Sequence, residues 1–348
     1  MTSRLSIFIG CIFFIVNAKA QIGGKSVFGF LNLAPTARAT AVGNGLLVVR
    51  EDDLGLGLVN PSLLNPQNHQ SLTFNHEFYP AKIQHGYFGY GHYVNKWKTT
   101  FQGGIQYMNY GTFTLADEYG NQLGNFKSNE VAFLVGAGYQ LSNRLSVGSN
   151  IKFVTSNLES YSANALALDL AATYYDTSSR LGLTFLMQNI GSQLGKYNIK
   201  ENIPYNVSIA IAKKLKYLPL RWMITMHDLN RWNMLFDDPN ADGNILFNGN
   251  ETQTTNQFST WTDNFFRHFT FGGEFLFGKK EVFRVRFGYN HQKRKEFSVA
   301  NYRSLAGFSG GFGITIKQFR LDYGFAKYHL AGGTNQISIS TNLNRFRR

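Results

Sequence analysis

Oxygen-bearing side chains recur at alternate positions in the polar stretch DPNADGN. Asp238, Asn240 and Asp242 stand two residues apart and are followed by a glycine. Carboxylate and amide oxygens at this spacing begin a calcium-binding loop, in which glycine permits the sharp turn. The twelfth position of that loop is Gly249, where a bidentate glutamate would complete a calcium site. The stretch therefore predicts either a weak calcium site at Asp238, Asn240 and Asp242 or an ordinary polar turn.

Charged residues also alternate with aromatic residues in the stretches FRVRFGY and FRLDYGF. The first carries Arg284 and Arg286, and the second carries Arg320 and Asp322. Because successive side chains of a β-strand point to opposite faces, the charges lie on one face and the aromatic residues on the other. The charged face could bind an anionic ligand, or its arginines could pair with carboxylates of the same protein.

Motifs for catalysis are absent from the sequence. It contains no G-x-S-x-G elbow, no H-E-x-x-H pair and no phosphate-binding loop, and its eight histidines are scattered. The single cysteine, Cys11, lies in the first twenty residues. We therefore expect a non-enzymatic protein without a cofactor, apart from the calcium candidate.

The N-terminus is typical of a secretory signal peptide. Arg4 precedes the apolar run Leu5–Val16, and the small residues Ala18 and Ala20 place a cleavage site before Gln21. A retained anchor is disfavoured because the run is too short to span a bilayer. A lipoprotein box at FIGC is the other alternative. The prediction is an exported chain in which residues 1–20 are removed.

Composition favours a membrane barrel over a helical membrane protein. Charged residues make up 16% of the chain and aromatic residues 15%, whereas soluble domains carry roughly 25% charged residues. The mean hydropathy is nevertheless −0.21, and no later apolar run approaches the length of a spanning helix. The hydropathy of barrel strands averages to such a value because apolar side chains facing lipid alternate with polar side chains facing water.

Positive charge exceeds negative charge throughout the chain. The formal charge of +13 becomes +11 without Arg4 and Lys19, and the cations are spread over predicted turns and loops. In an exported chain this excess favours attraction to anionic membrane lipid or lipopolysaccharide. No helix-turn-helix, zinc-finger or basic-helix pattern supports binding to nucleic acid.

Fourteen segments after residue 70 show strand character, an even number as bacterial barrels require. Their length is mostly near the 9 to 11 residues that a tilted membrane strand needs. The predicted strands are Ser71–Phe78, His85–Val94, Thr99–Asn109, Val131–Leu141, Leu145–Ser156, Ala165–Tyr175, Leu181–Asn189, Tyr205–Lys213, Arg221–Asp228, Phe269–Phe277, Val282–Asn290, Leu305–Ile316, Phe319–Ala326 and Gln336–Leu343. We expect an all-β, antiparallel transmembrane barrel over residues 71–348, with residues 21–70 as a compact leader of short helices and hairpins.

Connections between these segments alternate between short and long. This is the pattern of outer-membrane barrels, whose periplasmic turns are short and whose external loops are long. The longest predicted loops are Leu229–His268 and Tyr110–Glu130. Aromatic residues in the longest loop could anchor a partner, or they could pack against one another. The candidates are Trp232, Phe236, Trp261 and Phe265.

The leader carries the most specific resemblance to a known family. FLNLAPTARATAVGNG, an acidic turn and NPSLLNP precede the strands. In these motifs the chain resembles the PorV/PorQ group of outer-membrane proteins of the type IX secretion system, more the PorQ branch than the PorV branch. More distantly it is similar to the long-chain fatty-acid transporter barrels. The resemblance implies a fourteen-stranded barrel in which the leader, residues 21–70, is a plug that packs in or across the lumen. The PorQ-like resemblance implies that this barrel belongs to the cargo attachment complex and holds PorZ beside PorU and PorV in the bacterial outer membrane.

Two functions follow from these observations. The first is a non-enzymatic outer-membrane barrel that anchors a surface partner. The alternative is a transporter of hydrophobic or anionic small molecules through the lumen. Conductance or uptake in a reconstituted bilayer distinguishes them.

Overall fold

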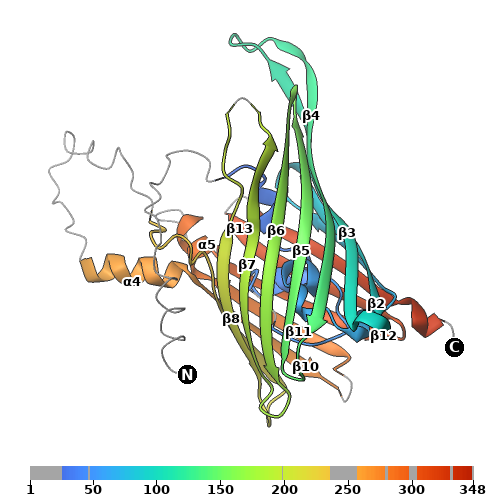
Figure 1. Cartoon of the computed structure of the whole chain (residues 1–348). Helices are drawn as coiled ribbons and strands as arrows, with labels where there is room; N and C mark the ends of the chain where they lie inside the picture. Colours follow the sequence, from blue (N-terminus) through green and yellow to red (C-terminus); the bar gives the residue numbers. More distant parts are fainter. Residues whose placement is uncertain are drawn as a thin grey trace, which may run out of the picture.

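Strand pairing closes the chain into a fourteen-stranded antiparallel barrel in the computed structural model (Figure 1). Each strand pairs with its neighbours in sequence, and β1 pairs with β14 to close the ring. The structure describes residues 26–45, 48–197, 199–235, 257–278, 281–297, 304–329 and 332–346. The predicted signal peptide lies outside these residues.

All fourteen predicted strands are confirmed, several with longer bounds. The strands are β1 (Ser71–Phe78), β2 (Gln84–Val94), β3 (Thr99–Ala116), β4 (Gln122–Gln140), β5 (Leu145–Leu158), β6 (Tyr161–Asp176), β7 (Leu181–Gly195), β8 (Asn206–Lys214), β9 (Leu220–Met226), β10 (Phe269–Phe277), β11 (Phe283–Asn290), β12 (Phe308–Ile316), β13 (Phe319–His329) and β14 (Gly332–Asn342).

Alternating burial along the strands separates a lipid face from a lumen face. In β13, Phe319, Leu321 and Phe325 are exposed on the outside, whereas Arg320 and Asp322 are buried inside. The same alternation holds along β4, β6 and β8. A continuous apolar exterior over a polar interior is what a barrel in lipid requires, since lipid cannot hydrogen-bond side chains.

The barrel is much taller on one side than on the other (Figure 1). Strands β3–β7 contain 14 to 19 residues and form what we name the tall wall. Strands β8–β12 contain 7 to 9 residues and form the short wall. The prediction of a long loop over Tyr110–Glu130 is wrong: β3 and β4 continue as a paired hairpin to a tight turn near Gly120.

Residues 26–45 and 48–70 lie inside the barrel, and we name these two segments the plug (Figure 1). They form short helices: η2 (Gly29–Asn32), α2 (Ala37–Ala41), α3 (Leu56–Val59), η3 (Pro61–Leu63) and η4 (Pro66–Asn68). The Thr36 side chain caps α2 by accepting a hydrogen bond from the Ala39 amide at 3.2 Å. The predicted hairpins are absent from the described part of this segment, where prolines and small residues favour single helical turns.

Helices outside the lumen are few among the described residues. They are η5 (Pro80–Lys82), η6 (Asn95–Trp97), α4 (Gln257–Arg267), α5 (His291–Glu296) and η8 (Leu343–Phe346). Within the described ranges, no helix combines the length and apolar character that crossing a membrane takes.

Candidate functional site

A buried carboxylate on the short wall is the central group of the candidate site. Glu274 of β10 has no exposed surface and accepts hydrogen bonds from three arginines. Arg38 of the plug binds both of its oxygens, at 2.8 and 2.9 Å. Arg221 donates to it at 2.6 Å and Arg286 at 2.8 Å. Bidentate, charge-assisted bonds of this kind fix geometry as well as add free energy, so Glu274 joins the plug to β9, β10 and β11.

The acidic turn of the plug, Glu51–Asp53, also pairs with arginines of this network. Glu51 accepts from Arg38 and from Arg221, both at 2.8 Å. Burial alone would raise the pKa of Glu51, but the attraction of Arg38 and Arg221 outweighs it and holds that pKa well below its usual range. The Glu51 carboxylate is therefore ionised in the folded protein.

Two aspartates extend the same network toward the C-terminus. Asp52 pairs with Arg320 of β13 and, at 2.7 Å, with Arg345. Burial of Asp52 opposes ionisation, yet Arg320 and Arg345 lower its pKa. Asp53 pairs with Arg38 at 3.0 Å. The acidic turn thus connects the plug to β13 through Arg320 and to the C-terminal segment through Arg345.

The four lumen charges expected from the strand pattern are all buried, but they differ in their partners. Arg286 reaches Asp322 at 2.6 Å, in addition to Glu274. Arg320 pairs with the acidic turn. Arg284 is only 5% exposed, and its Nε and Nη1 atoms are buried without a hydrogen-bond partner in the part of the chain that the structure describes. Arg286 and Arg320 therefore pair with carboxylates of the same protein, as one of the two alternatives predicted. No such ion pair of Arg284 is found among the described residues.

Amides hold the plug to the tall wall. Gln102 of β3 and Asn150 of β5 both donate to the Gly57 carbonyl, at 2.7 and 3.1 Å. Asn60 of the plug is within 3.3 Å of two threonine hydroxyls on β6 and β7. The main ion pair of this wall, Lys152–Asp169 at 2.7 Å, joins two strands and not the plug.

Small residues let the plug touch the barrel wall directly. A Cβ atom at Gly148 of β5 would lie 2.3 Å from the Pro61 carbonyl carbon, and one at Gly324 of β13 would lie 2.2 Å from the Ala37 oxygen. Real Cβ atoms do not approach so closely. Glycine is thus required where the plug backbone meets each side of the barrel.

An apolar core fills the upper part of the tall wall. The first residues of the plug pack there against alanines and other apolar side chains of β3–β6. This core contains Val27, Phe28, Phe30, Leu31, Met108, Ala132, Val154, Ala163, Ala165, Ala167 and Ile203. All are less than 9% exposed. The tall wall therefore holds the start of the plug by packing.

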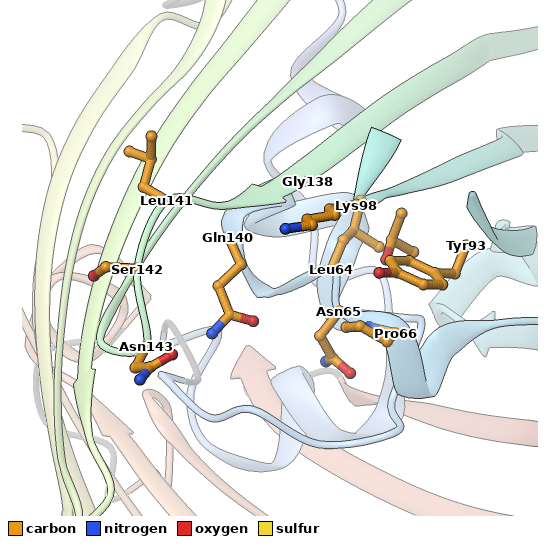
Figure 2. Close-up of a pocket in the computed structure, with 11 residues that line it drawn as sticks. Leu64, Asn65, Pro66, Tyr93, Lys98, Gly138, Gln140, Leu141, Ser142 and Asn143 are labelled. Carbon is orange, nitrogen blue, oxygen red and sulfur yellow. The ribbon is translucent and has the colours of Figure 1, made fainter. Parts of the chain in front are cut away.

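A pocket of about 300 Å³ opens at the end of the barrel that carries the short turns (Figure 2). Gln140 and Asn65 lie on opposite sides of it, with Tyr93 and Lys98 on the rim beside the plug. Polar side chains alternate with apolar ones in its lining, and Lys98 is the one charged side chain there. It identifies no particular ligand.

Three of the predicted loop aromatics form a stack outside the barrel. The rings of Trp261 and Phe265 lie 5.5 Å apart and nearly parallel, and Trp232 lies 6.3 Å from Phe265 and 5.0 Å from His268. These three residues therefore pack against one another, which was one of the two alternatives for the loop aromatics. Phe236 and the calcium candidates Asp238, Asn240 and Asp242 lie outside the described residues. Across the described ranges, no three histidine, cysteine or acidic residues are grouped to hold a metal ion.

Sequence reasoning missed Arg38 and Glu274, which form the centre of the site. Arg38 stands alone among the small residues of ARATA, and Glu274 stands alone on the lumen face of β10. A single charge in an otherwise uncharged element was the available signal. The pairing could not be read from the sequence, because Glu274 follows Arg38 by 236 positions.

The barrel is similar in fold to channels of known structure, although no family model and no curated protein matches the sequence. A mutant of the TodX monoaromatic hydrocarbon channel aligns with 88% of this chain and 97% of its own, at 11% identity and a TM-score of 0.50. The Pseudomonas putida toluene transporter TodX aligns over 88% and 96%, at 12% identity and a TM-score of 0.49. A Pseudomonas aeruginosa FadL homologue aligns over 88% and 98%, at 9% identity and a TM-score of 0.49. At such identities the likeness concerns the fold alone, and that fold is an outer-membrane β-barrel with fourteen antiparallel strands.

Proposed function

We propose that this chain is a sealed, non-enzymatic outer-membrane barrel that anchors a surface partner in a type IX secretion attachment complex. The observation that carries the proposal is the plug, which is fixed to both walls through Glu274 and Arg38 on one side and through Gly57 and Asn60 on the other. A lumen filled in this way suits a scaffold better than an open pore. The secretion role itself comes from the resemblance of the leader to the PorV/PorQ group.

The tall wall offers the surface for a partner. Its β3–β4 hairpin extends beyond the short wall and exposes Tyr119 by 83% and Leu123 by 64% near the turn. Phe113 and Phe126 stack across the hairpin at 5.3 Å and stiffen it. Rigid, exposed aromatic side chains are the usual anchors of protein interfaces.

The test replaces both exposed residues of the hairpin and measures the partner that remains bound. We expect the Tyr119→Ser/Leu123→Ser double variant to recover far less of a PorZ-like protein on affinity purification from the native bacterium. Tyr217→Ser/Leu218→Ser is the matched control, because these residues are equally exposed but lie in the turn between β8 and β9, at the opposite end of the barrel. Equal recovery from both variants would contradict the proposal.

A channel for hydrophobic small molecules is the second candidate. The likeness in fold to hydrocarbon channels favours it, as does the apolar core that Phe28, Phe30 and Leu31 fill inside the tall wall. The residues that fill this core belong to the plug, so a ligand would have to displace them. Uptake of toluene by a deletion strain, compared with the complemented strain, distinguishes the candidates, since the scaffold alone predicts equal uptake.

A further inference from the structure

Helix α4 is amphipathic, and two large side chains of its aromatic face are exposed. Phe258, Trp261 and Phe265 follow one another at helical spacing, so they share one face. Phe258 is 72% exposed and Trp261 is 54% exposed. Large aromatic side chains left in water at this density mark a surface with a partner.

Polar side chains of α4 hold the helix to the segment after β9 and to α5. Asn264 accepts a hydrogen bond from the Met234 amide at 2.8 Å and donates to the Trp232 carbonyl at 2.9 Å. Asp263 binds His291 and Lys295 of α5, each at 3.1 Å. Burial would raise the pKa of Asp263, but its bonds to Lys295, Arg267 and His291 lower it. These contacts fix the orientation of the helix, and so they fix the direction of its aromatic face.

The aromatic face continues the lipid face of the barrel without a break. Phe265 lies 5.0 Å from Phe269, and Phe266 lies 6.0 Å from it. Phe269 in turn stacks at 6.0 Å on Phe271, which belongs to the outward face of β10. Figure 1 shows α4 lying across the barrel axis beside the short wall and pointing away from it. The rim of the short wall is where the strands leave the lipid, so the helix lies at the level of the membrane surface.

Cations stand beside this helix. Lys293, Arg294 and Lys295 of α5 follow one another, and Lys295 is 44% exposed. Together α4 and α5 carry four cationic side chains, Arg267 included, against two carboxylates, Asp263 and Glu296. An apolar aromatic face with lysine and arginine at its edge is the composition of helices that lie in a lipid interface.

We propose that α4 is an interfacial helix that inserts its aromatic face into the outer leaflet beside the short wall, with the cations of α5 at anionic headgroups. The helix then anchors the rim of the barrel on the side where the strands are shortest. This inference requires only that the barrel lie in a membrane. It is independent of the surface partner and of any transported molecule.

The experiment places a polarity-sensitive fluorophore on the full-length protein in nanodiscs. Cys11, the sole cysteine of the sequence, is first replaced by serine, and single cysteines are then introduced as Phe258→Cys, Ser259→Cys or Leu123→Cys. Ser259 is the matched control, about 100° around the same helix from Phe258, and Leu123 reports a position in water. Retention of the fold is checked for each variant by its heat-modifiable mobility on gels.

At position 258 we expect blue-shifted emission and about threefold stronger quenching by lipids brominated near the glycerol end of the acyl chain than at position 123, because interfacial helices lie about 5–10 Å below the headgroups. Position 259 should be quenched less than position 258. Equal quenching at positions 258 and 123 would overturn the proposal.

A second arm tests the headgroup contact. Adding phosphatidylglycerol to phosphatidylcholine nanodiscs should strengthen quenching at position 258, and the substitutions Lys293→Gln and Arg294→Gln together, which leave the Lys295–Asp263 ion pair in place, should abolish that gain. A gain of unchanged size in the double variant would show that α5 does not contact anionic headgroups.

Discussion

Along the tall wall the plug meets alanines, amides and hydroxyls, whereas along the short wall and β13 it meets arginines and carboxylates. The first contact is made by packing around Phe30 and by donors to the Gly57 carbonyl. The second depends on ionised groups, with Glu274 shared among three arginines. One plug is thus held by two chemistries, and only the second responds to pH. Release of the plug should therefore begin at the short wall.

The largest effect is expected from Glu274→Gln. This change leaves the buried guanidinium groups of Arg38, Arg221 and Arg286 without their shared anion, and removing one partner of a buried ion pair costs about 3–5 kcal/mol. The loss of stability is measured as a fall in the midpoint of unfolding of the barrel by guanidinium chloride in detergent. Glu118→Gln, at the exposed turn of the β3–β4 hairpin, is the control and should leave the midpoint unchanged. A midpoint equal to that of the wild type would refute the role given to Glu274.

Phe30→Ala tests the packing that holds the plug to the tall wall. Phe30 is 2% exposed within the apolar core, and truncating a buried phenylalanine costs about 3 kcal/mol because it removes contacts and leaves a cavity. Because this packing involves no group that titrates between pH 4 and pH 7, the loss should be the same at pH 7 and at pH 4. Unfolding midpoints at both pH values test it, and a strongly pH-dependent loss would show that the tall wall is not held by packing.

The substitution Glu51→Gln tests whether the ion pairs at the short wall stabilise the protein in a pH-dependent way. The pKa of Glu51 is lower in the folded protein than the value of about 4.3 in an unfolded chain, so its ionised form stabilises the fold above that pH. We expect the variant to be about 1–3 kcal/mol less stable than the wild type at pH 7, since a buried charge-assisted hydrogen bond is lost. The difference should narrow as pH falls below about 4, because Glu51 is then protonated in the unfolded chain while it stays ionised in the folded protein. Melting curves from pH 7 to pH 3 test this, and a difference that widens on acidification has the wrong sign.

The smallest effect is expected from Arg284→Met. Two nitrogen atoms of Arg284 are buried without partners among the described residues, so an apolar side chain should change stability by no more than about 1 kcal/mol, or increase it. Arg286→Met, two residues along the same strand face, is the matched comparison and should lose several times more, because Arg286 binds both Glu274 and Asp322. Equal losses would mean that the two arginines have equivalent partners.

The period-two alternation of side chains predicted the strands because a barrel wall in lipid imposes it locally, residue by residue. The hairpin above the membrane lacks this constraint. Gly111, Gly120 and Gly124 have positive φ angles there, and its polar sequence reads as a loop. The lumen faces of Arg286 and Arg320 were likewise predictable from their own strands. Their partners were not, because Arg38, Glu51 and Glu274 come together only when the barrel closes around the plug.

Ion conductance in planar bilayers tests most directly the claim that buried charges hold the plug and seal the lumen. The wild-type protein should show no stable ion conductance at pH 7, and Glu274→Gln should produce open events as the short-wall side of the plug detaches. Steady conductance from the wild-type barrel, unchanged in Glu274→Gln, would contradict the account.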